Sequence, residues 1–310
     1  MSAKNKITTI ILTHNEELHI KRCIELAKTY SNKIYIVDSY SDDKTVEIAK
    51  SIGANVLQNK FINYSQQFSW ALRNINIKTE WTLRLDADEY LEKKLVDEID
   101  QRIDKLPSNI VGINFKRKHI FMNKWIRFGG RFPLILLRLW RTGQGYIENR
   151  WMDEHIILNN GKTITFKECF CDHNLKNLKF FIKKHDWYAD REAVDILAKK
   201  MNLFNQNNNL NLKNSSFKAS STRIIKNNIY NNLFFGIGPT LYFIYRYIIL
   251  LGFLDGKEGL IYHFLQGFWY RFLIDAKVFE FYNEIKDLKS VQDKIKKLSE
   301  ITNLELNSKT

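Results

Sequence analysis

The sequence predicts an α/β fold with a parallel sheet, followed by a mainly helical C-terminal region. Within the first hundred residues, short β-branched runs alternate with stretches whose apolar residues recur at helical spacing, and this alternation is typical of βαβ units. From residue 175 onward the pattern is helical. Polar clusters directly follow three of the predicted strands. Because parallel sheets bind ligands beyond the carboxyl ends of their strands, these clusters are candidate binding loops.

The elements of the first region follow one another in a regular order. Strands are expected over residues 7–13, 33–38, 54–57 and 81–85, and helices over residues 18–27, 46–52, 64–77 and 92–105. Gly53 ends the second of these helices, since glycine readily adopts the conformation that follows a helix. After Pro107 the pattern becomes β-rich, and further strands are expected over residues 110–118, 132–140, 155–158 and 163–170. We therefore expect an α/β domain over residues 1–174 and a helical region over residues 175–310.

The chain is basic, and its charge is concentrated in one part of it. The 310 residues include 48 Lys and Arg against 34 Asp and Glu, a net charge of +14, of which residues 112–151 carry +8. Such a charge suits a nucleic acid, an anionic membrane or a phosphorylated substrate. Nucleic-acid binding is the alternative that the charge alone favours, but no helix-turn-helix, RNP-like or zinc-finger pattern accompanies it. We therefore expect no nucleic acid partner.

The cysteines indicate the compartment rather than a metal centre. Three cysteines and the lack of an apolar leader after the first residues are typical of a protein of the reducing cytoplasm. Cys169, Cys171 and His173 are close in sequence. A structural zinc site needs a second pair of ligands, and the sequence offers none.

One apolar segment, residues 233–254, is long enough to test for a membrane span. It is interrupted by Arg246, by Pro239 and by two glycines. These interruptions favour an interfacial or buried hairpin over a true span.

Two aspartates, Asp86 and Asp88, follow the strand over residues 81–85 with one residue between them. Two carboxylates at a strand end can share a Mg²⁺ or Mn²⁺ ion that completes its shell with water and phosphate oxygens. Such an ion would stabilise the charge of a departing diphosphate. The alternative is that the aspartates cap the following helix, a position that aspartate favours.

The order of these clusters resembles the family 2 glycosyltransferases, whose nucleotide-sugar-binding α/β fold is called GT-A. Residues 13–16 are similar to the family's Thr-x-Asn-Glu turn after its first strand, and Asp86-x-Asp88 to its metal-binding Asp-x-Asp motif. The family's Asp-Asp-Gly-Ser-x-Asp-x-Thr pattern after the second strand is matched at Asp38, Ser41, Asp43 and Thr45. Ser39 and Tyr40 depart from that pattern.

Further segments look like one branch of the family, whose members build lipopolysaccharide core, capsule or exopolysaccharide. These segments are residues 67–74, 137–141, 153–155, 252–259 and 268–270. The resemblance thus covers nearly the whole chain, with the Asn-rich residues 205–214 outside it.

The resemblance implies roles for particular residues. The donor-binding residues would be Thr13, His14, Asn15, Glu16, Asp38, Ser39, Ser41, Asp43, Gln67, Trp70 and Asp86. Arg138 joins them because a guanidinium matches phosphate oxygens in geometry, although a solvated arginine on a half-buried strand is the alternative. Asp88 and Asp86 would hold Mg²⁺ or Mn²⁺, with His173 as a third ligand or simply a packed histidine.

An inverting transfer needs a carboxylate within reach of the acceptor hydroxyl. Glu154 is the preferred candidate for this catalytic base and Asp153 the second, with an exposed acidic turn as the alternative for both.

The sequence therefore predicts a cytoplasmic, metal-dependent, inverting family 2 glycosyltransferase. Its donor would be a UDP- or GDP-linked sugar and its acceptor a glycan, lipid-linked or part of lipopolysaccharide or capsule, reached by peripheral contact with the inner membrane. A non-catalytic assembly partner with the same fold is the alternative, which the intact acidic motifs disfavour. A basic nucleic-acid-binding protein is the less favoured one.

Overall fold

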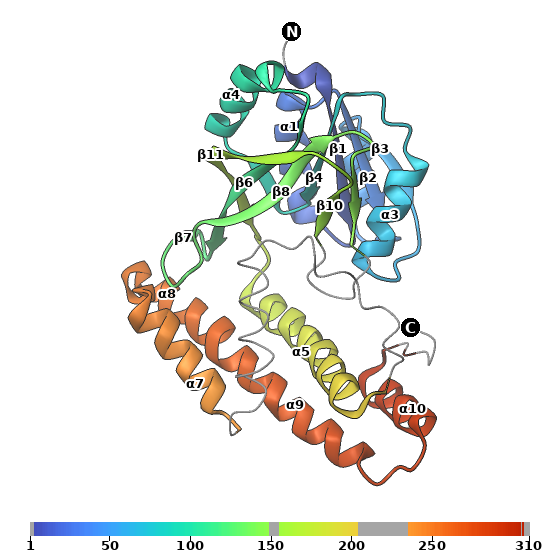
Figure 1. Ribbon diagram of the computed structural model, residues 1–310, viewed down its shortest axis with the longest axis vertical. Helices are drawn as coiled ribbons and strands as arrows, with labels where there is room; N and C mark the ends of the chain where they lie inside the picture. Colours follow the sequence, from blue (N-terminus) through green and yellow to red (C-terminus); the bar gives the residue numbers. More distant parts are fainter. Residues whose placement is uncertain (1–2, 149–154, 204–234, 305, 307–310) are drawn as a thin grey trace. The chain divides into compact units, whose positions relative to one another are not determined.

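A computed structural model describes residues 3–148, 155–203, 235–304 and 306 of the chain (Figure 1). The chain divides into two compact units, Met1–Leu175 and Lys176–Thr310, and each is described by itself. The first is the α/β unit and the second is helical, so the predicted fold class is confirmed. Asp153 and Glu154, the two candidates for the catalytic base, lie outside the described residues.

The first unit is built around one mixed sheet. Its strands are β1 (Ile7–Thr13), β2 (Lys33–Asp38), β3 (Asn55–Gln58), β4 (Trp81–Asp86), β5 (Glu89–Leu91), β6 (Ile110–Phe121), β7 (Lys124–Ile126), β8 (Leu134–Arg141) and β11 (Lys162–His173). They are ordered β3-β2-β1-β4-β8-β6-β11-β5, and β7 pairs with β6. The short strands β9 (Gly145–Ile147) and β10 (Ile156–Leu158) form a separate antiparallel pair.

The parallel half of the sheet sets the position of the site. In β1, six of the seven residues are buried, which is typical of a parallel strand covered on both faces. The register pairs Thr13 of β1 with Asp38 of β2, and Leu12 of β1 with Asp86 of β4. The carboxyl ends of three adjacent strands therefore meet at one edge, as the sequence predicts.

The other half of the sheet brings distant segments to the same edge. Strand β5 follows β4 after the two-residue turn Ala87–Asp88, and it pairs with the far end of β11, where Cys171 lies opposite Tyr90 and Asp172 opposite Glu89. The last residue of β11, His173, donates its backbone N–H to the carbonyl of Asp88 at 3.0 Å. Strands β5 and β7 were not predicted from the sequence because three residues are too few to show a period.

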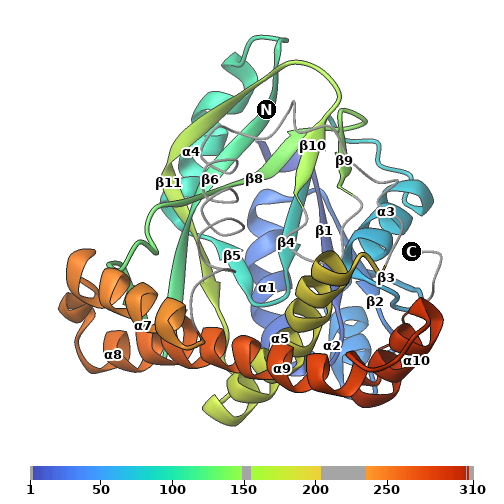
Figure 2. The ribbon, with the colours of Figure 1, turned by 60° about the horizontal axis from the view of Figure 1, so that its bottom comes forward.

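Helices cover both faces of the sheet (Figures 1 and 2). They are α1 (Glu17–Tyr30), α2 (Thr45–Ser51), α3 (Tyr64–Asn74) and α4 (Lys93–Arg102), with short 3₁₀ turns η1 (Ala3–Lys6) and η2 (Ile103–Lys105). Side chains alternate along a strand, so Ile7 and Ile11 of β1 pack with α1 and α4, whereas Ile10 packs with α3. The two apolar clusters hold the loops at the strand ends from both sides.

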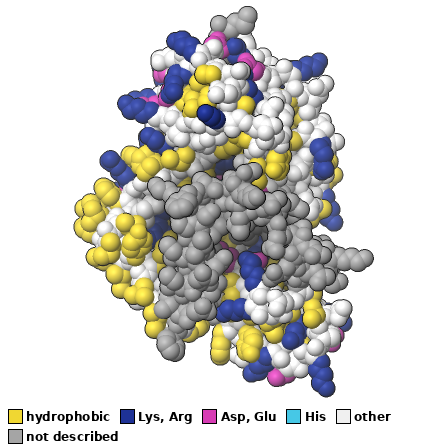
Figure 3. Space-filling model, viewed as in Figure 1, with side chains coloured by type: hydrophobic (Ala, Val, Ile, Leu, Met, Phe, Trp, Pro, Cys, Tyr) yellow, Lys and Arg dark blue, Asp and Glu magenta, His cyan; other side chains and the backbone are white. Residues whose placement is uncertain are grey.

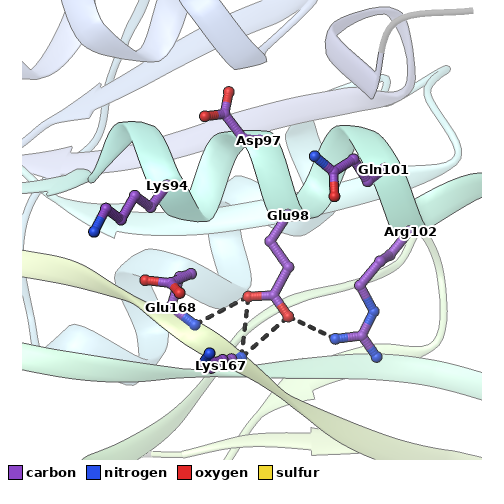
Figure 4. A pocket seen from close by; sticks show the side chains of 7 residues that line it. All are labelled: Lys94, Asp97, Glu98, Gln101, Arg102, Lys167 and Glu168. Atoms are coloured by element: carbon purple, nitrogen blue, oxygen red, sulfur yellow. Dashed lines mark hydrogen bonds and ion pairs between the residues drawn. The ribbon is translucent and has the colours of Figure 1, made fainter.

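A carboxylate stabilises an irregularity in β11. The register between β11 and β6 shifts between Thr165 and Cys169, which leaves backbone N–H groups without strand partners. Glu98 of α4 accepts hydrogen bonds from the N–H groups of Lys167 and Glu168 at 2.9–3.1 Å and from the Arg102 guanidinium (Figure 4). Burial opposes ionisation, but these donors still lower the pKa of Glu98. Glu98 lines a shallow pocket between α4 and β11, and its carboxylate is already engaged there by the backbone of β11 and by Arg102.

The second unit consists of helices. They are α5 (Leu178–Met201), α7 (Ile237–Ile244), the π-helical η5 (Tyr245–Ile249), the 3₁₀ turn η6 (Gly252–Asp255), α8 (Gly256–His263), the π-helical η7 (Phe264–Trp269), α9 (Tyr270–Ile285) and α10 (Val291–Thr302). Asn177 and Ser290 cap α5 and α10 with side-chain hydrogen bonds, as these residue types favour. An apolar cluster joins α5, α9 and α10. Among the described residues, a single helix that could cross a membrane is not found.

Candidate functional site

The loops that follow β1 and β2 are linked by a polar network around Asp38. This side chain is completely buried, and its carboxylate accepts hydrogen bonds from the Thr13 hydroxyl at 3.0 Å, the Ser41 backbone at 2.9 Å and the Gln58 amide at 3.2 Å. Ser41 in turn accepts the N–H of Asn15 at 2.9 Å. A buried carboxylate that receives this many donors fixes the loops that it joins.

A second set of contacts joins the same two loops at the start of α1. The N–H of Glu16 donates to the Thr45 hydroxyl at 2.7 Å, and that of Glu17 donates to Asp43 at 3.1 Å. Asp43 also accepts the Thr45 N–H at 2.9 Å. Acceptors at the first turn of a helix satisfy N–H groups that have no partner within it. The predicted residues of both loops thus lie together, apart from His14, which is exposed.

The turn after β2 contains backbone strain. Tyr40 has a φ of 56° and an exposed side chain, and it stands where the family pattern has glycine. The left-handed region costs a residue with a Cβ about 1–2 kcal/mol relative to glycine. The departure from the family pattern at Tyr40 therefore has an energetic cost.

Replacing Tyr40 by glycine should raise the free energy of unfolding by about 1 kcal/mol, because relief of this strain exceeds the greater freedom of glycine in the unfolded chain. Urea unfolding of the wild type and Tyr40→Gly would measure it. Tyr35→Gly, in the middle of β2 where no positive φ occurs, is the control and should destabilise the protein. A Tyr40→Gly variant less stable than the wild type would contradict the inference that the backbone of Tyr40 is strained.

Gln67 and Trp70 of α3 have different surroundings. The buried Gln67 amide donates to the Ser39 hydroxyl and to the Asn59 carbonyl, both at 3.1 Å, and accepts from the Asn59 side chain at 2.7 Å. Gln67 therefore holds the turn after β2 from the protein interior. Trp70 is half-buried and packs against the apolar cluster that contains Phe68.

Asp86, at the end of β4, is held by three neighbours. It accepts a hydrogen bond from the Tyr64 hydroxyl, whose oxygen also accepts from Arg84 at 3.2 Å, and its second oxygen is 3.6 Å from the Arg138 guanidinium. Burial raises the pKa of Asp86, but Arg138 and Arg84 outweigh it, and the net direction is downward. Asp86 is therefore a carboxylate whose charge is balanced within the protein.

Arg138 of β8 makes its closest ion pair with Glu89 of β5. Both are almost completely buried, and the guanidinium lies 2.5 Å from Glu89. The other carboxylate oxygen of Glu89 accepts the N–H of Asp86 at 3.0 Å. Burial raises the pKa of Glu89 to about 8 although Arg138 acts in the opposite direction. The sequence suggested Arg138 as a diphosphate ligand. In the structure Arg138 is buried, and its guanidinium contacts Glu89 and Asp86.

Asp88 lies in the turn between β4 and β5 and is half-buried. Its carboxylate accepts from the Asn174 amide at 2.9 Å. Beside it, His173 has Nδ1 3.2 Å from the Arg22 guanidinium and Nε2 3.2 Å from the Asn123 side-chain oxygen. Because arginine only donates, Nδ1 is the acceptor and Nε2 carries the hydrogen. Burial and Arg22 lower the pKa of His173, which favours the neutral ring.

The fit of a divalent ion depends mainly on Asp88. Within the ranges that the structure describes, no group of three or more His, Cys, Asp or Glu side chains is arranged to hold a metal. Mg²⁺ needs only one or two protein carboxylates when substrate phosphates complete its shell. Asp88 meets this requirement, and Asp86, two residues before it, has Arg138 as its counter-ion. A helix-capping role is excluded, since α4 begins at Lys93 after β5.

The residues on either side of 149–154 are tied to this edge. The N–H of Glu148 donates to the carbonyl of His155 at 2.9 Å. The carbonyl of Glu148 accepts from the Ser65 hydroxyl at 2.8 Å. Ser65 is next to Tyr64, the partner of Asp86, so both ends of the segment that contains the candidate base lie at the start of α3.

Several site residues had no signal in the sequence. Arg22 joins His173 to α1 by donating to its carbonyl at 2.6 Å. His19 is completely buried, and its ring joins Glu16, at 2.5 Å, to the N–H of Leu175, at 2.8 Å. These side chains belong to an ordinary helical pattern, and only pairing of β5 with β11 brings their partners within reach.

Polar loops beyond the carboxyl ends of a covered parallel sheet, with acidic side chains at the strand ends, are the arrangement in which open α/β sheets bind their ligands. The family model Glycosyl transferase family 2 matches residues 8–167, which is just over half of the chain. The chain therefore belongs to glycosyl transferase family 2.

Similar proteins agree with this membership. An uncharacterized glycosyltransferase of Rickettsia bellii is 43% identical over 95 residues, which cover 31% of this chain and 32% of the relative. The glycosyltransferase SunS of Bacillus subtilis is 36% identical over 90 residues, 28% of this chain and 21% of the relative. The chain thus spans about a third or less of the length of these relatives.

Among solved structures, glucosyl-3-phosphoglycerate synthase from Mycobacterium tuberculosis, in complex with Mn²⁺, UDP and glucosyl-3-phosphoglycerate, is similar over 37% of this chain and 44% of that chain. The identity is 16% and the TM-score is 0.30.

Proposed function

We propose that the protein transfers a sugar, with inversion, from a nucleotide-diphospho-sugar to a glycan acceptor. The observation that carries the proposal is the convergence of the Asp38 network, Asp86 and Asp88 on one edge of the sheet. The donor-binding residues would be Thr13, His14, Asn15, Glu16, Asp38, Ser39, Ser41, Asp43, Gln67, Trp70 and Asp86, with Arg138 acting through Asp86. The donor is proposed to be UDP- or GDP-linked.

Asp88 would hold Mg²⁺ or Mn²⁺ together with the diphosphate, and Asp86 would support it from behind. His173 is bonded through its backbone to the Asp88 carbonyl, and its ring could serve as the third ligand only if Nδ1 gave up Arg22 or Nε2 lost its hydrogen. When bound, the ion supplies positive charge for the leaving diphosphate. The Tyr64 and Arg138 contacts keep the Asp86 carboxylate ionised and oriented, so that it needs no rearrangement when the donor arrives.

Glu154, or Asp153 in its place, would remove the proton from the acceptor hydroxyl. A base must come within hydrogen-bond reach of that proton, and the neighbouring residues Glu148 and His155 are fixed next to Ser65. The displacement then takes place at the anomeric carbon, with the acceptor oxygen entering and the nucleoside diphosphate leaving.

The acceptor is proposed to be a lipid-linked glycan or part of a lipopolysaccharide, capsule or exopolysaccharide. Peripheral contact with the cytoplasmic face of the inner membrane would bring the enzyme to it. The net charge of +14 supports this placement, because basic residues near an anionic leaflet are each worth about 1 kcal/mol. Three unpaired, buried cysteines are compatible with a reducing compartment.

A screen of UDP- and GDP-sugars by thermal unfolding, with Mn²⁺ or Mg²⁺ and with a chelator, tests the donor. A true donor should raise Tm in the presence of the metal, because a ligand that binds only the folded state stabilises it by mass action. Failure of every nucleotide sugar to shift Tm would favour the alternative, a non-catalytic partner with the same fold.

Glu154→Gln should lower kcat by about 10²–10⁴-fold, the usual contribution of general-base catalysis, while the donor-induced Tm shift stays unchanged. Asp153→Asn, measured beside it, is the matched control that separates the two candidates. The readout is release of nucleoside diphosphate with the identified donor. Full activity of both single variants and of the double variant would refute the assignment.

A further inference from the structure

The hairpin formed by residues 237–269 of the second unit has an apolar exterior. Eleven of its large apolar side chains are at least two-fifths exposed, with Ile249 at 63% and Leu241 and Leu254 each at 52%. The whole set is Ile237, Leu241, Ile244, Tyr245, Ile248, Ile249, Leu251, Phe253, Leu254, Leu260 and Phe264. Figure 3 shows hydrophobic side chains gathered over α7 and α8. Soluble proteins rarely expose continuous apolar surface of this extent without a partner.

The interior of the hairpin has the opposite character. Arg246 is only 3% exposed, donates to the Gln266 amide oxygen and lies over the rings of Tyr242 and Tyr262. His263 is completely buried, with its Nε2 4.0 Å from the Asp255 carboxylate.

Charged side chains are almost never fully buried in water-soluble proteins, whereas large aliphatic ones usually are. Apart from the exposed Lys257 and the half-buried Glu258, the hairpin reverses this rule on both counts. Such a reversal is expected where the surroundings are hydrocarbon, since polar side chains in a membrane face the protein interior and pair there.

Close packing holds the polar residues inside. A Cβ added to Gly252 would lie 2.7 Å from the His263 ring, and one added to Gly259 would lie 2.5 Å from Asp255. Both glycines are needed for the chain to turn this tightly around the buried pair. The helices on either side of the turn, Ile237–Ile249 and Gly252–Ile285, are apolar enough together for a membrane segment but are bent by 70°.

Basic and aromatic residues lie at the border of this surface. Helices α5 and α9 run in the same direction, because the ring of His185 packs on Tyr270 and Leu197 packs with Phe281. The first turns of α5 therefore lie at the hairpin end of α9. There, exposed Leu178 and Ile182 are interleaved with exposed lysines at positions 179, 183 and 184.

This border is suited to an anionic bilayer. Residues 176–310 hold 21 Lys and Arg against 13 Asp and Glu, a net charge of +8. Lysines beside an apolar surface attract anionic headgroups, and tryptophan and tyrosine prefer the headgroup level. Trp187 on α5 is exposed and Trp269 is half-buried at the end of the hairpin.

We propose that residues 237–269 dock into one leaflet of an anionic lipid bilayer, with the apolar exterior among the acyl chains and the lysines of α5 at the headgroups. The inference rests on the membrane contact of the proposed function and assigns that contact to a surface, and it does not depend on which donor is bound. The occupant is the bilayer itself, because hydrocarbon explains both the apolar exterior and the polar interior, whereas a protein partner would explain only the first.

Co-sedimentation of the full chain with vesicles tests the docking. Phosphatidylcholine vesicles with phosphatidylglycerol should retain the wild type, and pure phosphatidylcholine should retain it less. Leu241→Glu/Ile248→Glu places two charges on the exposed face and should lower the partition coefficient about 100-fold or more. Val291→Glu is the matched control, because Val291 is 43% exposed at the start of α10, and it should bind as the wild type does.

A fluorophore attached to the apolar surface measures how deeply that surface enters the bilayer. The three native cysteines are buried, and burial raises the pKa of Cys23 and that of Cys171, so a thiol reagent should label a new exposed cysteine selectively. A fluorophore on Ile248→Cys should be quenched by nitroxide-labelled acyl chains, and one on Val291→Cys should not be.

Two results would overturn the proposal. One is equal vesicle binding by the wild type and the folded double variant, with folding checked by circular dichroism. The other is no binding to vesicles together with a dimer, in sedimentation velocity, that the double variant abolishes, since a second copy would then cover the surface. Donor binding is measured on the same proteins by Tm shift. If the protein binds vesicles but no nucleotide sugar shifts its Tm, the proposed sugar transfer is refuted and the proposed docking still stands.

Discussion

Replacing Arg138 by methionine is expected to destabilise the protein by about 3–5 kcal/mol at pH 9, where Glu89 is ionised in the wild type, the usual cost of removing one partner from a buried ion pair. The guanidinium lies 2.5 Å from Glu89 and is 4% exposed. Without it, Glu89 is a buried carboxylate with no counter-ion, and Asp86 loses the neighbour that does most to lower its pKa. Urea unfolding of the wild type and variant measures the loss.

The pH dependence has a definite sign. Burial raises the pKa of Glu89 to about 8 even beside Arg138, and removal of the guanidinium raises it further. A group whose folded pKa is raised binds its proton more tightly in the folded state, so its ionisation destabilises the fold as pH rises. The deficit of Arg138→Met should therefore be smaller at pH 5 than at pH 9.

A double variant separates the ion pair from the packing. Arg138→Met with Glu89→Gln removes both charges and should recover most of the lost stability, because the two residues are in contact and their effects are not additive. If Arg138→Met alone were as stable as the wild type, the guanidinium would not be a structural counter-ion, and direct contact with the diphosphate would become the better interpretation of Arg138.

The sequence predicts the parallel half of the fold well. Each of its strands is a short buried run that ends in polar residues, and the expected edge is where Thr13, Asp38 and Asp86 meet. This success has a physical basis. Parallel strands buried on both faces need continuous apolar runs, and the loops after them need residues that bond to the backbone.

The antiparallel half was less predictable. Strand β5 has three residues, and nothing local indicates that it pairs with the end of β11. This pairing places His173 beside Asp88 and brings Arg22 to its ring. Pairing between strands far apart in the sequence is determined by tertiary packing, so it cannot be predicted from a local pattern of residues. The ion pair of Arg138 with Glu89 was missed for the same reason.

The helical unit illustrates a third case. Composition alone indicated an apolar segment broken by Arg246 and could not say which residues face outward. The hairpin resolves this, since Arg246 lies inside and Ile249 outside. The two π-helical stretches, η5 and η7, add one residue to a turn, so that the usual helical period no longer identifies the buried face.

Asp88→Asn should lower kcat by about 10²–10³-fold without changing stability. The expected loss matches the removal of one electrostatic contact to a developing charge. The side chain is half-buried and accepts a hydrogen bond from the Asn174 amide, and the oxygen of an asparagine could accept the same bond. Stability should therefore stay within about 0.5 kcal/mol of the wild type. Asp97→Asn, an exposed acidic residue on α4, is the control for loss of one negative charge.

Chelation distinguishes the metal role from other roles of Asp88. If Asp88 acts through a divalent ion, removing the ion should reduce the wild type to about the activity of Asp88→Asn and should change the variant little, because two changes that disable one interaction do not add. Equal fractional losses on chelation in both proteins would show that Asp88 and the ion act separately. In that case Asp88 would serve the acceptor or the turn between β4 and β5, and the donor diphosphate would be held by other groups.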